Sequence, residues 1–150
     1  MKIDFNQKKG FICDMDGVLY HGNRVLPGAV EFIQSLQREK KEYLFLTNNS
    51  GMTPRELGQK LERMGLKVPE EHFYTSALAT AEFLKAQAPG CSAFVIGEAG
   101  LLNALYDAGI TMNDVNPEYV VIGEGRTYSL DTLTRAVNLV LGGAKLIGAN

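Results

Sequence analysis

The chain has 150 residues, a formal net charge of −2 at pH 7 and 45% hydrophobic residues. This length suits one ordinary domain or a domain with a small appendage, and the composition excludes long disorder. No basic stretch is typical of nucleic-acid binding, and no apolar run approaches the length that crosses a membrane. The start has no apolar signal-peptide core, which favours the cytoplasm. We therefore expect neither a nucleic-acid polymer nor a membrane as a partner.

The first predicted element is a short apolar strand at residues 10–13, which leads into Asp14 and Asp16. A short uncharged run between turn signals is typical of a buried strand. Residues i and i+2 of a strand share a face, so both carboxylates should project toward one spot. Two carboxylates this close repel each other, and burial would raise the cost of charging either. Such a pair indicates either a cation between them or an acid that holds a proton.

The two cysteines are predicted to be reduced thiols rather than a disulfide. Cys13 belongs to the first strand, whereas Cys91 follows a Pro-Gly turn. A thiolate beside two carboxylates, with no neighbouring cation, would have a raised pKa. Cys13 is therefore interpreted as a small core residue and not as a nucleophile.

Apolar strand-like runs then alternate with amphipathic helix-like runs along the rest of the chain. Helices are predicted at residues 29–38, 54–64, 76–87, 100–108 and 129–141. Strands are predicted at residues 42–46, 73–74, 93–96, 119–122 and 145–147. This alternation predicts an α/β fold with a parallel sheet, whose crossover helices cover both faces.

Polar residues also follow the second strand, as Thr47, Asn48, Asn49 and Ser50. Ligands of parallel α/β sheets bind beyond the carboxyl ends of the strands, and hydroxyl, amide and backbone N–H groups there bind anions such as phosphate. Beside two carboxylates, Mg²⁺ fits as the cation because it prefers oxygen ligands and bridges carboxylates to phosphate. A loop with its own side-chain turns stays open as an alternative for residues 47–50.

The two acids suit different chemical roles. An ionised carboxylate can attack phosphorus to give an aspartyl-phosphate, while a second acid protonates the leaving oxygen. Asp14, at the strand tip, suits the nucleophile and the metal ligand. Asp16, beside Gly17, suits the proton exchange.

Other chemistry-bearing patterns are weaker. An EF-hand calcium loop is excluded because Val18 and Val25 stand where that loop needs an oxygen ligand. His21 is interpreted as a surface residue, with a catalytic base as the less favoured alternative. Residues 123–126 resemble a dinucleotide-binding turn, but Tyr128 occupies the position of its third glycine.

The segments 14–19 (Asp-Met-Asp-Gly-Val-Leu) and 44–50 (Leu-Phe-Leu-Thr-Asn-Asn-Ser) resemble the first two motifs of the haloacid dehalogenase-like phosphatases. More narrowly, they resemble subclass IIA, the p-nitrophenylphosphatase and NagD-like nucleotide or sugar phosphatases. Residues 74–77, 119–123 and 148–150 agree further, as do Gly97 and Gly100, so the resemblance covers nearly the whole chain.

The resemblance implies a Mg²⁺-dependent phosphomonoester hydrolase that acts on a small sugar phosphate or nucleotide through an aspartyl-phosphate. Asp14 would be the nucleophile and a metal ligand. Asp16 would be the general acid/base and would contribute to metal and phosphate binding. Thr47 and Asn48 would hold the phosphoryl oxygens. The partner would be a small phosphorylated metabolite, and a homo-oligomer through the cap stays open.

The same resemblance implies a Rossmann-like core at residues 1–85 and an inserted α/β cap at residues 86–150. The third motif of the family, a lysine, and the fourth, a metal-binding acid, would lie beyond Asn150. We therefore expect the front half of a longer protein, one piece of a complex, or an inactive remnant. A non-catalytic phosphate- or metal-binding module and a phosphotransferase or mutase stay open as alternatives. The identity of the ester depends on cap surfaces that periodicity does not reveal.

Overall fold

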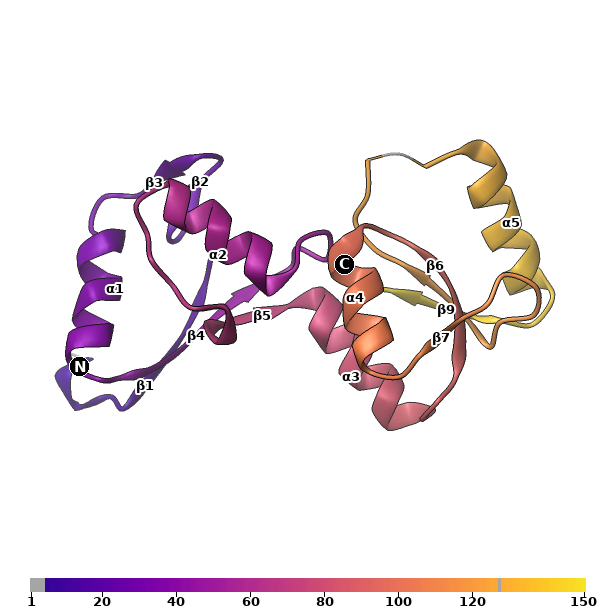
Figure 1. Cartoon of the computed structure of the whole chain (residues 1–150), viewed down its shortest axis with the longest axis horizontal. Helices are drawn as coiled ribbons and strands as arrows, with labels where there is room; N and C mark the ends of the chain where they lie inside the picture. Colours follow the sequence, from indigo (N-terminus) through magenta and orange to yellow (C-terminus); the bar gives the residue numbers. More distant parts are fainter. Residues whose placement is uncertain (1–4, 127) are drawn as a thin grey trace, which may run out of the picture. The chain divides into compact units, whose positions relative to one another are not determined.

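The computed structural model describes residues 5–126 and 128–150, and these form two compact units (Figure 1). The first unit comprises the described residues up to Thr47 together with Pro54–Tyr74. The second comprises Asn48–Thr53 and Thr75–Asn150. The short segment Asn48–Thr53, which follows the second strand motif, therefore belongs to a different unit from the residues on both sides of it.

The first unit is built on a sheet of β1 (Gly10–Asp14), β4 (Glu42–Thr47) and β5 (Phe73–Thr75), in the order β1-β4-β5. Strands β1 and β4 are parallel, and their register runs from Gly10 opposite Glu42 to Asp14 opposite Leu46. Helix α1 (Ala29–Arg38) precedes β4, and α2 (Pro54–Arg63) follows it. The predicted strand–helix alternation and parallel pairing are confirmed in this unit.

Aromatic side chains form part of the packing of this sheet. Tyr43 and Phe45 lie on one face of β4 and are buried, because alternate residues of a strand point to the same side. The rings of Phe45 and Phe73 lie 6.2 Å apart between centroids, which joins β4 to β5. Helix α1 contributes Ile33 and Leu36, two buried residues at helical spacing.

The first strand, which we expected to be buried, is largely exposed. Ile12 keeps 72% of its surface accessible, and Phe11 is only half-buried against Phe32, with 5.9 Å between ring centroids. The reason is its place in the sheet, since in the described part of the chain β1 has a neighbouring strand on one side only. An apolar run predicts a strand, but it does not predict which strand lies at the edge.

A short hairpin follows the first strand and was missed by the sequence analysis. Strands β2 (Tyr20–His21) and β3 (Arg24–Val25) pair in antiparallel register around the two-residue turn Gly22-Asn23. Two residues of this type between short strands are a recognised hairpin signal. Two 3₁₀ turns, η1 (Phe5–Gln7) and η2 (Glu70–His72), were also not predicted.

The second unit contains a four-stranded parallel sheet in the order β7-β6-β8-β9. The strands are β6 (Ser92–Ile96), β7 (Thr111–Met112), β8 (Tyr119–Ile122) and β9 (Lys145–Gly148). They alternate with α3 (Ser76–Gln87), α4 (Ala99–Asp107) and α5 (Leu130–Leu141). Only β7, which has two exposed residues, was not predicted.

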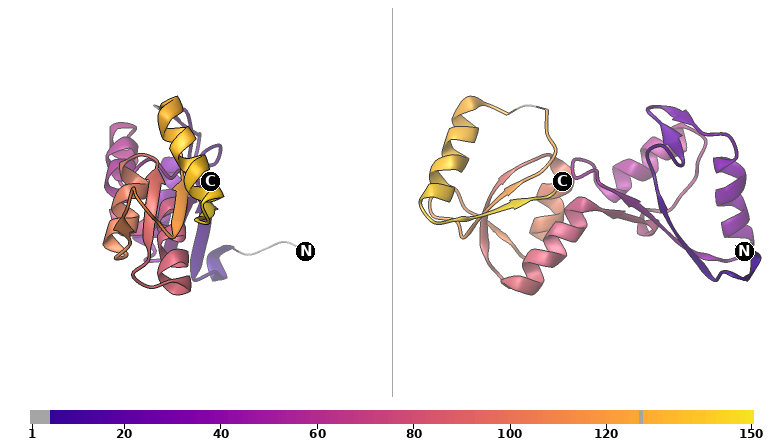
Figure 2. Two further views of the ribbon diagram at one scale, coloured as in Figure 1. Left: turned by 90° about the vertical axis from the view of Figure 1, so that its right-hand side faces the viewer. Right: turned by 180° about the vertical axis from the view of Figure 1, so that it is seen from behind.

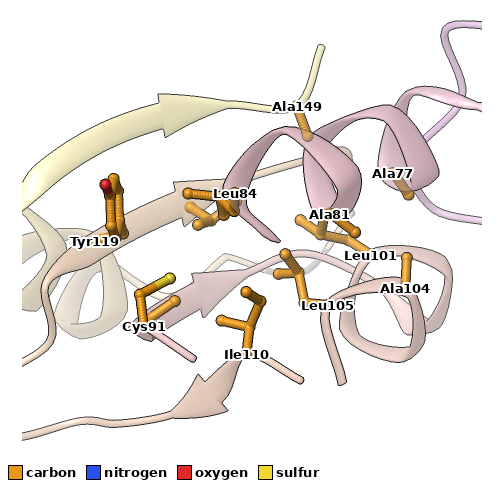
Figure 3. Close-up of a cluster of buried hydrophobic side chains, with 12 residues drawn as sticks. Ala77, Ala81, Leu84, Cys91, Leu101, Ala104, Leu105, Ile110, Tyr119 and Ala149 are labelled. Carbon is orange, nitrogen blue, oxygen red and sulfur yellow. The ribbon is translucent and has the colours of Figure 1, made fainter. Parts of the chain in front are cut away.

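Helices cover both faces of this sheet. On one face, α3 and α4 pack against β6 and β8 around a buried cluster that includes Leu84, Leu105 and Val121 (Figure 3). On the other face, Ala136 of α5 packs with Phe94 and Val120, and α4 and α5 lie on opposite sides of the sheet (Figure 2, left). None of the helices in the described ranges is long and apolar enough to cross a membrane.

The boundary between the units differs from the expected domain boundary after residue 85. That position lies inside α3, and the division by contacts falls between Tyr74 and Thr75. The reason is that α3 buries Ala77, Ala81 and Leu84 in the same cluster as α4. The assignment of a core at residues 1–85 and a cap at residues 86–150 stays a prediction.

Candidate active site

Two of the predicted site residues, Asp14 and Thr47, end neighbouring strands of the first unit. Asp14 is the last residue of β1 and Thr47 the last of β4, and the register places Asp14 opposite Leu46. The side chain of Asp14 is exposed, and its Oδ1 accepts a hydrogen bond of 2.7 Å from the backbone N–H of Met15. The parallel pairing thus places these two residues at the carboxyl ends of neighbouring strands, on the same side of the sheet, as the sequence predicted.

A tight turn after β1 presents Asp16 on the same unit. The carbonyl of Met15 accepts a 2.9 Å hydrogen bond from the N–H of Leu19, and the N–H of Gly17 donates to the carbonyl of Tyr20 over 2.7 Å. Gly17 has φ of 78°, a left-handed conformation that glycine adopts without strain. Met15 and Leu19 are buried, which anchors the turn, while Asp16 stays exposed.

Tyr20 is a neighbour of both carboxylates that the sequence analysis did not single out. It is buried, and Nζ of Lys60 lies 4.3 Å from the centre of its ring. Burial raises the pKa of the Tyr20 hydroxyl, and the negative charges of Asp16 and Asp14 raise this pKa further. Its place at the start of the hairpin could have been found from the Gly22-Asn23 turn.

The two histidines have different surroundings. Nδ1 of His21 lies 3.7 Å from Oδ1 of Asp16, but the side chain of His21 is 85% exposed, so solvent screens the attraction. His72 stacks on Tyr43 with 3.8 Å between ring centroids, and its Nδ1 lies 2.9 Å from the Tyr43 carbonyl oxygen. His72 precedes β5 and thus helps to pack the amino end of the sheet.

Asn48, the fourth predicted site residue, belongs to the second unit. Its backbone carbonyl accepts a 2.8 Å hydrogen bond from Oγ of Ser76, and its Nδ2 donates to Oδ1 of Asn150 over 3.4 Å. The next residue, Asn49, accepts a hydrogen bond at Oδ1 from the N–H of Met52, which is a local side-chain turn. This turn at Asn49 agrees with the alternative interpretation of residues 47–50 as a loop with its own side-chain turns.

The donor set of the first unit fits Mg²⁺, although it is small. Asp14 and Asp16 offer oxygen ligands, and Mg²⁺ is commonly held by one or two carboxylates together with waters and substrate phosphate. Within residues 5–126 and 128–150, no three or more His, Cys, Asp or Glu side chains gather where they would hold a metal. The metal roles of both acids stay predictions.

The two cysteines belong to different units. Both are free thiols, as predicted, and Cys91 is fully buried in the second unit. Partial burial raises the pKa of the Cys13 thiol, whereas the sequence analysis attributed the raised pKa to the neighbouring carboxylates. A raised pKa lowers the fraction of nucleophilic thiolate at neutral pH.

The sequence matches a known protein family and is similar to named phosphatases. Residues 11–111 match the model of a family described as haloacid dehalogenase-like hydrolase. The chain is 50% identical over 140 residues to dihydroxyacetone phosphatase of Corynebacterium glutamicum, covering 93% of this chain and 51% of that protein. It is 43% identical over 142 residues to ribonucleotide monophosphatase NagD of Escherichia coli, covering 95% and 56%.

Solved structures give the same result. NagD from Escherichia coli superposes with a TM-score of 0.89 at 43% identity, covering 95% of this chain and 57% of that chain. A 4-nitrophenylphosphatase from Thermotoga maritima superposes with a TM-score of 0.88 at 32% identity, covering 95% and 55%. The chain spans about half the length of the relatives it matches. The resemblance found in the sequence is confirmed.

Proposed function

Because this chain belongs to the haloacid dehalogenase-like hydrolases, we propose that it provides the nucleophile of a Mg²⁺-dependent phosphomonoester hydrolase. The observation that carries the proposal is the parallel register of β1 and β4, which ends both strands at one edge with Asp14 and Thr47. Relatives of this chain carry the names dihydroxyacetone phosphatase, ribonucleotide monophosphatase and acid sugar phosphatase. A small phosphorylated metabolite is therefore the proposed substrate.

The first half-reaction forms an aspartyl-phosphate. An ionised oxygen of Asp14 attacks phosphorus, and the bond between phosphorus and the leaving oxygen breaks with its electron pair on that oxygen. Asp16 donates a proton to the leaving oxygen, so an alcohol departs. Thr47 and Asn48 orient the phosphoryl oxygens through hydroxyl, amide and backbone N–H donors.

The second half-reaction returns the enzyme to its starting state. Asp16, now ionised, takes a proton from a water molecule whose oxygen attacks phosphorus. The bond between phosphorus and Asp14 breaks, and inorganic phosphate leaves. The carboxylate of Asp14 and the backbone carbonyl of Asp16 would hold Mg²⁺, which when bound neutralises charge on the phosphoryl group. Most of the rate enhancement would come from positioning and charge stabilisation.

The test is hydrolysis of p-nitrophenyl phosphate in the presence of Mg²⁺ by the wild-type protein and by Asp14→Asn. The substitution keeps the size of the side chain but removes the nucleophilic charge, so the rate should fall by roughly a thousandfold or more. Asp131→Asn is a matched control, because Asp131 is an exposed acid in the first turn of α5 and far from β1 in the sequence. Full activity in Asp14→Asn would refute the assignment.

Two other outcomes would select the alternatives. Saturable binding of inorganic phosphate without turnover would favour a non-catalytic binding module. Transfer of the phosphoryl group to an added alcohol in preference to water would favour a phosphotransferase or mutase, which shares the aspartyl chemistry.

A further inference from the structure

The sheet of the second unit has the topology in which a ligand is expected. From β6 the chain moves outward to β7 on one side and to β8 and then β9 on the other, so the winding direction reverses between β6 and β8. In open parallel α/β sheets, ligands bind at the carboxyl ends of the strands at this switch point. Gly97 and Glu98 follow β6, and Gly123 and Glu124 follow β8.

The switch point is occupied by the chain itself. The segment Asn48–Thr53 is hydrogen-bonded to α4, which follows β6, and to Glu124, which follows β8. The N–H of Gly100, in the first turn of α4, donates to the carbonyl of Gly51 over 2.9 Å. The N–H of Glu124 donates to Oγ of Ser50 over 2.7 Å, and Ser50 is fully buried.

Close approach at this point depends on two glycines. A Cβ added to Gly100 would lie 2.6 Å from the carbonyl oxygen of Met52, a backbone atom that moves only if the segment moves. A Cβ added to Gly123 would lie 2.6 Å from Cδ2 of Leu101 in α4 and 2.9 Å from Oγ of Ser50. Glycine at these positions therefore allows the segment to lie directly on α4 and on the end of β8.

Side chains of the second unit also hold the two asparagines of the segment. Oε2 of Glu124 accepts a 2.6 Å hydrogen bond from Nδ2 of Asn49, a short bond with a charged acceptor. Ser76 donates to the carbonyl of Asn48 over 2.8 Å. Each of the four residues from Asn48 to Gly51 is thus hydrogen-bonded to α3, to α4 or to Glu124, which follows β8.

From these contacts we infer that the switch point of the second unit is a holder for the segment that carries Asn48, with Glu124 as its positioning residue. The inference rests on the proposed function, in which Asn48 binds the phosphoryl group. Glu124 acts through Asn49 and Ser50, the two residues that follow Asn48, and holds the backbone that carries Asn48.

The test compares variants that release the segment with variants that leave it in place. Glu124→Ala removes the acceptor for Asn49, whereas Glu124→Gln keeps an oxygen that can accept the same bond. Glu118→Ala is the matched control, because the Glu118 carboxylate accepts a 2.9 Å bond from the N–H of Ser92 at the opposite edge of the sheet. Gly100→Ala introduces the clash, and Gly148→Ala, whose Cβ would lie 3.9 Å from its nearest neighbour, controls for it.

Two measurements are made on each variant. Amide hydrogen exchange of residues 49–52, with the NMR signals of the Asn48 and Asn49 side chains, reports the order of the segment without any ligand. In Glu124→Ala this exchange should accelerate about tenfold, the change expected when a hydrogen bond to a charged group is lost. In Gly100→Ala it should also accelerate, because the added Cβ pushes the carbonyl of Met52 away. Titration with inorganic phosphate and Mg²⁺ then reports binding, which should weaken several-fold in the same two variants and recover in Glu124→Gln.

The outcomes separate the two proposals. If hydrogen exchange is unchanged in Glu124→Ala and Gly100→Ala, the switch point does not hold the segment. Equal acceleration in the Glu118→Ala control would contradict the proposal in the same way. Accelerated exchange with unchanged phosphate affinity overturns the link between the holder and the phosphate. If the wild-type protein does not bind phosphate but the exchange accelerates as expected, the proposed function fails and the holder stands.

Discussion

The two units contain the same kind of parallel sheet but use its carboxyl edge differently. In the first unit, β1 ends in Asp14, which is open to solvent, and β4 ends in Thr47, which is half-buried. In the second unit, the ends of β6 and β8 are covered by Asn48–Thr53. The same edge therefore serves, in our account, for chemistry in one unit and for holding a segment of the chain in the other.

The units also differ in how well their strands are covered. In the second unit Val120 and Val121, consecutive residues of β8, are both completely buried because helices pack on both faces of the sheet. In the first unit Ile12 of β1 is 72% exposed. This difference predicts that removing a buried side chain of the second unit will lower the free energy of unfolding far more than removing an exposed side chain of β1.

The largest expected effect is a difference in the free energy of unfolding between one variant of each unit. Leu105→Ala in α4 removes a fully buried side chain and should lower the free energy of unfolding of the second unit by about 2–5 kcal/mol. Ile12→Ala removes a mostly exposed side chain and should cost less than about 1 kcal/mol. Urea denaturation of both variants measures the difference. Equal costs would show that β1 is covered in solution.

A smaller effect is expected from Tyr20 at alkaline pH. Burial and the two carboxylates raise the pKa of Tyr20 in the folded state above its ordinary value of about 10. The folded state then holds this proton more tightly than the unfolded state, so the free energy of unfolding falls as pH rises from the unfolded pKa through the folded one.

The check is a series of denaturation curves at increasing pH for wild type and Tyr20→Phe. The stability of the wild type should decline more steeply above pH about 10 than that of Tyr20→Phe, which has no proton to lose at this position. If the free energy of unfolding falls with pH equally in both proteins, the pKa of Tyr20 is not raised in the folded state.

The smallest expected effect is a difference in the rate at which Cys13 of the first unit and Cys91 of the second react with a thiol reagent. Burial raises the pKa of both thiols, so each should react more slowly with a thiol reagent than a free cysteine does at the same pH. Cys13 is half-buried and Cys91 is buried, so Cys13 should react first. Cys13→Ser and Cys91→Ser assign the two reaction phases. Faster labelling of Cys91 would contradict the description of the second unit as the better covered one.

Much of the fold could be predicted because its signals are local. The helices at residues 29–38 and 76–87 have the predicted bounds, and the strand at 119–122 is found as expected. Helix α3 is capped by Thr75, whose Oγ1 accepts a hydrogen bond from the N–H of Leu78. The hairpin at Tyr20–Val25 has strands of only two residues, too short for periodicity to reveal.

The candidate site could be predicted only where it depends on parallel pairing. The positions of Asp14 and Thr47 at neighbouring strand ends follow from strand order and register. The contacts of Glu124 with Asn49 and Ser50 join residues more than 70 positions apart, and no local pattern indicates them. The exposure of β1 was also not predictable, because it depends on which strands are neighbours.

The most direct test of this account is chemical detection of the phosphoryl group on the protein. The protein is incubated with p-nitrophenyl phosphate and Mg²⁺, quenched in acid and digested, and its peptides are analysed by mass spectrometry. If Asp14 is the nucleophile, the peptide that contains Asp14 should carry a phosphoryl group, and the same peptide of Asp14→Asn should carry none. No phosphoryl group on that peptide, or an unchanged one in Asp14→Asn, would contradict the central claim.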